Sequence, residues 1–227
     1  KKAISKLFPL ADHIIAQTEE MKTELVDIIG IAEDKVKVLH NPIDTKTIIK
    51  KIEGLESPFP DNNATRFIAV GRICEQKGYD LLVKAFAEVK RNIPNAELYI
   101  LGKQDVEWLG ITKNIIETEH LNECVHFLGY QDNPYIYVKH ADCFVLSSRW
   151  EGLPNVLIEA LYLGTPAATF RCIPIIERII KEGVNGFTAD KENTNSLASA
   201  MINTAQLGRV ESSYFGAKLE DFETLFS

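Results

Sequence analysis

The sequence predicts an α/β fold, a Rossmann-like parallel sheet with helices on both faces. From Arg66 to Gln206, runs of four or five apolar residues alternate with longer segments of helical periodicity. This alternation is typical of a parallel sheet that is buried on both faces. The chain has 227 residues, of which 45% are apolar, so it can form one large domain, or one domain plus a piece of another.

Four segments are expected along the chain. They are residues 1–44, a remnant of an N-terminal domain with its hinge; 45–65, a linker; 66–206, the main domain; and 207–227, a C-terminal tail or helix. In the first segment we expect strands at 11–17 and 36–39. Thr18 is expected to cap a helix with Met21, Leu25 and Ile28 on one face. The second segment is polar and contains Ser57-Pro58-Phe59-Pro60, which is typical of a linker.

The main domain has a regular order of elements. The predicted strands span 67–70, 97–101, 125–128, 143–146, 167–170 and 186–189. The predicted helices span 78–92, 106–120, 134–139, 154–163, 174–181 and 194–206. In the fourth helix, Pro154 suits the first turn and Gly164 suits the end. Ligands of such sheets bind at the carboxyl ends of the strands, so we expect the site there.

Composition excludes several classes of function. A net charge of −7 argues against a surface that binds nucleic acid. No apolar run is long enough to span a bilayer and no signal peptide is recognisable, so we predict a cytoplasmic protein, with the inner face of the membrane as an alternative location. The four cysteines are widely spaced and are expected to be free thiols. The five histidines show no ligand spacing, so we predict no metal site.

The stretch from Ser147 to Thr165 carries the first functional signal. It contains Glu151 just before the predicted helix and Glu159 about a turn and a half inside it. Free backbone N–H groups at the helix start bind phosphate, whereas carboxylates accept hydrogen bonds from hydroxyl groups. A nucleotide sugar, with a diphosphate between two hydroxyl-bearing rings, satisfies both. Alternatively, Glu151 complements the helix dipole and Glu159 is a solvated surface residue.

A second signal is the loop from Val70 to Gly78. Its glycine spacing matches neither a dinucleotide fingerprint nor a P-loop. It places Arg72 and Lys77 on either side of a strand-to-helix turn, where a planar guanidinium and a mobile ammonium can hold a diphosphate. The alternative is two solvated surface cations. Both residues are expected at the same sheet edge as the glutamates, and this convergence favours a ligand site.

Together these motifs resemble a known family. The matching pieces are Val70-Gly71-Arg72, Lys77-Gly78, Gly129-Tyr130, Ala141-Asp142, Ser147 to Pro154, Pro154 to Ala160, and Gly183 to Phe187. With seven residues between Glu151 and Glu159, the sequence resembles the C-terminal half of a retaining GT-B glycosyltransferase of family 4. The resemblance covers residues 11–206 and implies that most of the acceptor-binding domain lies outside this chain.

The resemblance implies a role for each matching position. Arg72 and Lys77 would bind the departing diphosphate, Glu151 the donor sugar, and Glu159 the ribose hydroxyls. The other positions implied to contact the donor are Gly71, Gly102, Tyr130, Gln131, Gly152, Leu153, Pro154, Asn155 and Val156. The family uses no cofactor and no bound divalent metal.

The implied reaction is transfer of a hexose from a nucleotide-diphosphate sugar, with uridine diphosphate (UDP) as the first candidate nucleotide, to a saccharide or lipid-linked acceptor in surface polysaccharide biosynthesis. The N-terminal domain would be the partner in cis, with peripheral membrane contact through it. The isolated chain is then expected to bind nucleotide diphosphate weakly and to transfer no sugar, because half of the cleft is missing.

Other activities on the same fold remain open at this point. A metal-independent nucleotide-sugar epimerase would use carboxylates as acid and base, and a non-catalytic binding module would bind the donor without transfer. A dehydrogenase is disfavoured because no three-glycine turn is present. The segment from Phe170 to Glu177 lacks the glycines that relatives often carry there, which leaves the identity of the donor sugar open.

Overall fold

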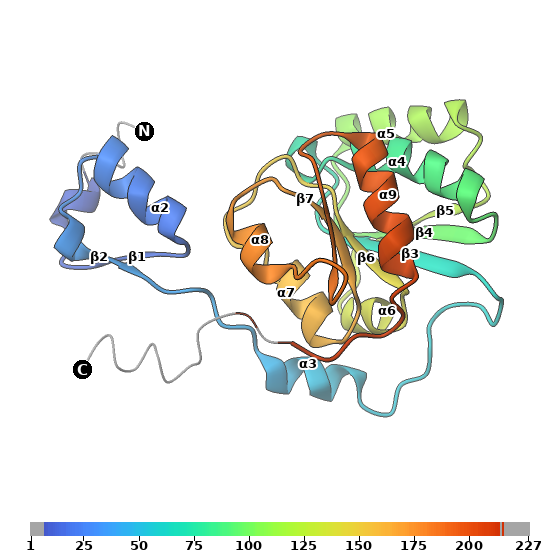
Figure 1. Ribbon diagram of the computed structural model, residues 1–227, viewed down its shortest axis with the longest axis horizontal. Helices are drawn as coiled ribbons and strands as arrows, with labels where there is room; N and C mark the ends of the chain where they lie inside the picture. Colours follow the sequence, from blue (N-terminus) through green and yellow to red (C-terminus); the bar gives the residue numbers. More distant parts are fainter. Residues whose placement is uncertain (1–6, 214, 216–227) are drawn as a thin grey trace. The chain divides into compact units, whose positions relative to one another are not determined.

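The computed structural model describes residues 7–213 and 215 (Figure 1). The described chain divides into two compact units. One comprises residues 7–43, 152–155 and 215, and the other comprises 44–151 and 156–213. In the described ranges, none of the helices has the length and apolar character needed to cross a bilayer.

The smaller unit contains a two-stranded parallel sheet of β1 (Ile14–Ala16) and β2 (Val36–Val38). Between them lies α2 (Glu19–Thr23), and the Thr18 hydroxyl accepts a hydrogen bond from the Met21 amide at 3.3 Å, which confirms the predicted cap. The helix then widens into a π-helical turn, Glu24–Ile28. The prediction that Ile28 shares a face with Met21 and Leu25 was wrong. Met21 and Leu25 pack against the small core, whereas the Ile28 side chain is 69% exposed, because the wider turn breaks the 3.6-residue periodicity.

The larger unit is built on a six-stranded parallel sheet, which confirms the predicted fold class. Its strands are β3 (Thr65–Val70), β4 (Ala96–Leu101), β5 (Val125–Gly129), β6 (Cys143–Leu146), β7 (Ala167–Phe170) and β8 (Gly186–Ala189), in the order β5-β4-β3-β6-β7-β8. All six coincide with predicted strands to within two residues. The strand order reverses between β3 and β6, and this opens a crevice at the carboxyl ends of the two strands.

Helices cover both faces of this sheet (Figure 1). They are α4 (Tyr79–Asn92), α5 (Val106–Thr118), α6 (Tyr135–Lys139), α7 (Asn155–Tyr162), α8 (Ile175–Ile179) and α9 (Thr194–Ala205). Connections between parallel strands are right-handed, so the direction in which the chain crosses the sheet decides the face on which each helix lies. From β3 to β5 the chain proceeds toward one edge, which places α4 and α5 on one face. From β5 to β8 it proceeds toward the opposite edge, which places α6, α7 and α8 on the other face. The last helix, α9, packs against α4. The core centres on Phe67 of β3, whose ring meets Phe86 of α4 edge-on at 5.9 Å.

The expected linker is partly helical, which corrects the prediction for residues 45–65. Helix α3 (Thr45–Ile52) begins after Asp44, whose carboxylate accepts a hydrogen bond from the Thr47 amide at 2.9 Å. Ile48 and Ile52 are buried, and α3 packs against α6. The segment was not predicted as a helix because it is mostly polar. Its buried face consists of only two isoleucines, four residues apart. Residues 44–65 therefore belong to the larger unit.

The predicted C-terminal tail is only partly described. Residues 207–213 form no helix or strand, and the Arg209 guanidinium donates to the Thr165 hydroxyl at 2.9 Å. The prediction of a helix further along falls on residues 214 and 216–227, outside the described residues.

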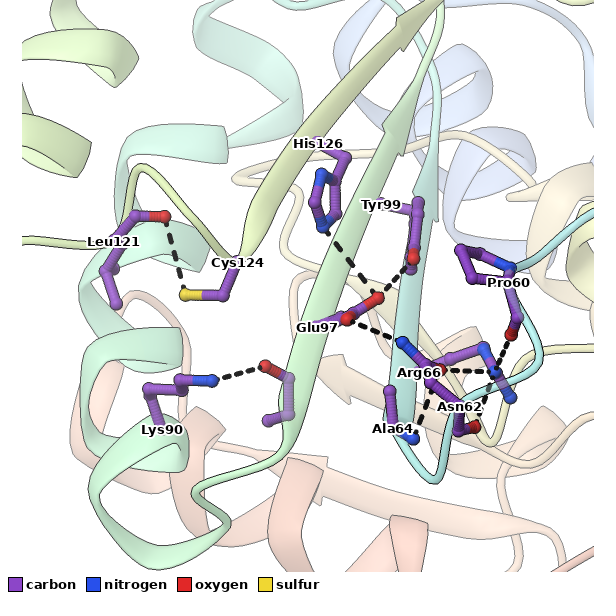
Figure 2. A network of polar contacts seen from close by, with 11 residues as sticks. Pro60, Asn62, Ala64, Arg66, Lys90, Glu97, Tyr99, Leu121, Cys124 and His126 are labelled. Atoms are coloured by element: carbon purple, nitrogen blue, oxygen red, sulfur yellow. Dashed lines mark hydrogen bonds and ion pairs between the residues drawn. The ribbon is translucent and has the colours of Figure 1, made fainter.

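A polar network closes the amino ends of the strands (Figure 2). The Arg66 guanidinium donates to the Pro60 carbonyl at 2.7 Å, and the Asn62 amide donates to the Glu97 carboxylate at 3.2 Å. Glu97 also accepts a hydrogen bond from the Tyr99 hydroxyl. These contacts tie the segment before β3 to β4, so this edge of the sheet is fixed by internal contacts.

Candidate functional site

A cavity of about 380 Å³ lies at the carboxyl ends of β3, β4 and β5. It is lined by Lys51, Val70, Gly71, Arg72, Leu101, Gly102, Lys103, Tyr130, Gln131, Asp132, Pro134 and Tyr135. The structure thus brings together five predicted positions from three separate loops: Gly71, Arg72, Gly102, Tyr130 and Gln131. The lining contains three cations and one carboxylate, so it favours an anionic ligand.

The floor of this cavity depends on close approach of two strand ends. The Gly71 amide donates to the Leu101 carbonyl at 2.9 Å, and the Gly102 amide donates to the Gly129 carbonyl at 2.8 Å. Gly102 has a φ of +147°, and a Cβ atom there would lie 1.9 Å from the Gly71 carbonyl oxygen. No larger residue fits without separating β3 from β4, so glycine is required where the loops of the site begin.

Glu159 lies in a smaller neighbouring cavity. Val70, Pro134 and Tyr135 line both cavities, so the two share part of their walls. The Tyr135 hydroxyl donates to Glu159 Oε1 at 3.3 Å. Burial raises the pKa of Glu159, and the Tyr135 hydrogen bond opposes that rise only in part. Burial, with the Glu159 charge nearby, raises the pKa of Tyr135 to about 12. Glu159 therefore presents a partly desolvated carboxylate that can accept hydrogen bonds from hydroxyl groups.

Lys77 and Glu151 form a direct ion pair. The Lys77 ammonium lies 2.6 Å from Glu151 Oε1, and the Ser148 hydroxyl donates to the same oxygen at 2.6 Å. The two charged side chains are only 19% and 8% exposed. A Cβ atom built on Gly71 would lie 3.1 Å from Cε of Lys77, so the lysine stem passes directly beside a residue that lines the larger cavity.

Arg149 joins the loop after β6 to the loop after β3. Its guanidinium donates to both oxygens of Asp80, at 2.9 and 2.7 Å, and to the Glu75 carbonyl at 2.8 Å. The Ser147 hydroxyl donates to the Lys77 carbonyl at 2.8 Å. Two chain segments about 70 residues apart are therefore held in one arrangement at the crevice where the strand order reverses.

The remaining predicted positions are not all placed at the cavities. Val156 lines the smaller one. Gly152, Leu153, Pro154 and Asn155 group with the smaller unit, so contact between them and a donor stays a prediction.

Sequence reasoning missed four polar residues that line the larger cavity: Lys51, Lys103, Asp132 and Tyr135. Lys103 directly follows Gly102, and Asp132 directly follows Gln131, so both could have been predicted from their position after a strand end. Tyr135 is the first residue of α6. Lys51 had no signal, because its segment was interpreted as a linker. Within residues 7–213 and 215, His, Cys, Asp and Glu side chains do not gather into a group able to hold a metal ion.

Two family models match the chain. Residues 51–209 match the family model for glycosyl transferases group 1, and residues 1–47 match the model for glycosyltransferase family 4. An uncharacterized glycosyltransferase of Methanocaldococcus jannaschii is 36% identical over 173 residues, which are 75% of this chain and 42% of that protein.

A second relative is the N-acetylgalactosamine-N,N'-diacetylbacillosaminyl-diphospho-undecaprenol 4-alpha-N-acetylgalactosaminyltransferase of Campylobacter jejuni, which is 33% identical over 165 residues. These are 70% of this chain and 41% of that enzyme. The chain thus spans about half the length of the curated relatives that it matches, or less.

Solved structures show the same fold. Anabaena HepE in complex with UDP and glucose superposes with a TM-score of 0.75 at 20% identity, over 91% of this chain and 59% of that one. A mutant of S. aureus TarM in complex with Fondaparinux, alpha-GlcNAc-glycerol and UDP also gives a TM-score of 0.75 at 20% identity, over 90% of this chain and 39% of that one. The fold is that of GT-B glycosyltransferases. By its family match over residues 51–209, this chain belongs to the glycosyl transferases group 1 family.

Proposed function

We propose that the chain is mainly the donor-binding part of a retaining hexosyltransferase that uses a nucleotide-diphosphate sugar. The observation that carries the proposal is the convergence at one sheet edge. Arg72 lines the larger cavity, the Lys77–Glu151 pair lies beside it, and Glu159 lines the neighbouring smaller cavity.

The site chemistry suits departure of a nucleoside diphosphate. Negative charge builds on the diphosphate as its bond to the sugar breaks, and fixed cations aimed at that position stabilise the transition state. Arg72 and Lys77 would supply this charge, Glu159 would accept the ribose hydroxyls, and Glu151 would face the donor sugar. No metal or cofactor takes part in the proposed reaction.

Uridine diphosphate is the first candidate nucleotide, because both neighbours described above were crystallised with UDP. A lipid-linked saccharide acceptor is supported by the diphospho-undecaprenol in the name of the Campylobacter jejuni relative, and a role in polysaccharide biosynthesis by relatives named for amylovoran biosynthesis. We further propose that the protein acts in the cytoplasm, with the inner face of the membrane as an alternative location.

Nucleotide binding by the chain tests the proposal. Thermal shift with uridine, guanosine and adenosine diphosphates identifies the ligand, and calorimetry then compares Glu159→Ala with Glu177→Ala. Glu177 is an exposed carboxylate on α8 outside both cavities, so its removal provides a matched control. We expect about tenfold weaker binding for Glu159→Ala, because charged hydrogen bonds of about 1.4 kcal/mol are lost, and no change for Glu177→Ala. Equal affinity in all three proteins would remove Glu159 from the ribose site.

A further inference from the structure

The α3 helix places a third cation at the larger cavity. Among the described residues that line this cavity, Lys51 alone precedes β3 in the chain; the others lie at the ends of β3 and β4, in the loops after β3, β4 and β5, or at the start of α6. It lies in the second half of α3, next to Ile52, which is buried and anchors the helix. The position of Lys51 is therefore set by the packing of α3 against α6.

Two reciprocal hydrogen bonds join Lys51 to the loop that follows β5. The Lys51 ammonium donates to the Asp132 carbonyl at 3.0 Å, and the Asn133 side-chain amide donates to the Lys51 carbonyl at 2.7 Å. The second bond uses the main chain of Lys51, so it attaches the helix to the loop whatever side chain residue 51 carries. Attachment of α3 alone therefore does not require a lysine.

The ammonium also lies close to the proposed ribose site. It is 5.7 Å from the centre of the Tyr135 ring, and the Tyr135 hydroxyl donates to Glu159. An ammonium carries three N–H donors, and within the described residues the one hydrogen bond of this group is to the Asp132 carbonyl. Two donors thus remain for a ligand in the cavity.

We propose that Lys51 is a donor-binding residue, whose ammonium contacts an oxygen acceptor of the bound nucleotide. This inference rests on the proposed function and extends the site to a helix outside the strand-end loops. The acceptor is either a phosphate oxygen or a carbonyl oxygen of the base, since an ammonium binds both. A purely structural lysine would affect the α3–α6 packing and leave nucleotide affinity unchanged.

The test compares Lys51→Met with Lys50→Met by calorimetry. Methionine keeps most of the aliphatic stem and removes the charge, and the Asn133 bond to the main chain remains. Lys50 is the adjacent exposed lysine and lies outside the cavity, so its replacement changes the net charge equally. Thermal denaturation without ligand confirms that both variants are folded.

We expect Lys51→Met to bind UDP about fivefold to tenfold more weakly than wild type, which corresponds to one charge-assisted hydrogen bond. Lys51→Arg is expected to retain most of the affinity, and Lys50→Met all of it. Uridine as a second ligand identifies the acceptor: a loss for UDP alone assigns a phosphate oxygen, and an equal loss for both assigns the base. Unchanged affinity of Lys51→Met overturns this inference and leaves the proposed function standing. Failure of the wild type to bind any of the three nucleoside diphosphates overturns both.

Discussion

The Lys77 ammonium and the Glu151 carboxylate lie 2.6 Å apart, in a position where both side chains are mostly shielded from water. The family resemblance implies that each residue serves the donor on its own, with Lys77 on the diphosphate and Glu151 on the sugar. In the structure each neutralises the other. Binding of a diphosphate would thus offer Lys77 a second anion, next to the one that it already holds.

Lys77 and Glu151 are predicted to have strongly coupled effects on the free energy of unfolding. Lys77→Met leaves the Glu151 carboxylate shielded from water with only the Ser148 hydroxyl as a partner, so we expect a loss of about 2–3 kcal/mol in the free energy of unfolding. The double variant with Glu151→Gln should recover part of this loss. Urea unfolding of the four proteins in a double-mutant cycle measures the coupling, and strictly additive effects would show that the pair contributes nothing.

Glu159 is predicted to reduce stability at neutral pH. Because burial raises its pKa in the folded protein above the ordinary value of 4.5, the ionised carboxylate carries a cost above the raised pKa. That cost disappears as the pH falls towards 4.5. We therefore expect Glu159→Gln to melt at a higher temperature than wild type at a pH of about 7.5, with the difference shrinking as the pH is lowered. A difference that grows on acidification contradicts this prediction.

The Arg149 guanidinium is predicted to hold the loop after β6 against the segment after β3. Arg149→Met leaves the Asp80 carboxylate, which is only 9% exposed, without its bidentate partner. We expect a loss of about 3 kcal/mol in unfolding free energy. Arg149→Lys is expected to recover only part of it, because an ammonium lacks the planar fork. The control is Arg91→Met, which removes an exposed pair with Glu88 and should change stability by less than about 1 kcal/mol. Equal effects of the methionine variants in urea unfolding would refute the anchoring role.

Gly102 is predicted to tolerate no side chain. Gly102→Ala places a Cβ against the Gly71 carbonyl at an unfavourable φ, so we expect a loss of about 2–3 kcal/mol in stability and weaker nucleotide binding. Gly110→Ala is a matched control in the middle of α5, where a Cβ meets no atom within 4 Å. It should raise stability by about 0.5–1 kcal/mol. Chemical denaturation and nucleotide titration of both variants measure the contrast, and a Gly102→Ala protein as stable as wild type would contradict the close approach of the strand ends.

Sequence periodicity predicted the strands of the larger unit well, because each buried strand is a short apolar run closed by a glycine, a serine or a polar turn. It could not predict the order of the strands, which depends on crossovers between distant segments. The failure at Ile28 has a local cause, since a π-helical turn changes the spacing on which such reasoning depends.

The sequence predicted at which edge of the sheet the site lies, but it did not predict the contacts between the side chains of the site. Arg72, Gly102 and Gln131 each stand at or just after a strand end, so the fold itself brings them together. The pairing of Lys77 with Glu151 depends on side-chain conformation across two loops, which no motif encodes. Lys51 was missed because a short helix with two buried isoleucines has too little periodicity to stand out from a polar segment.

Helix α3 also decides where this protein can be cut or recombined. The family match begins at residue 51, inside the helix, and the expected linker would have placed a junction as late as residue 65. A chimaera joined at residue 51 would divide α3 between two parents, and one joined at residue 65 would take Lys51 from a different parent than the loop at Asp132. Exchange of donor domains between relatives should therefore use a junction ahead of Asp44, so that the helix travels with the cavity that it helps to line.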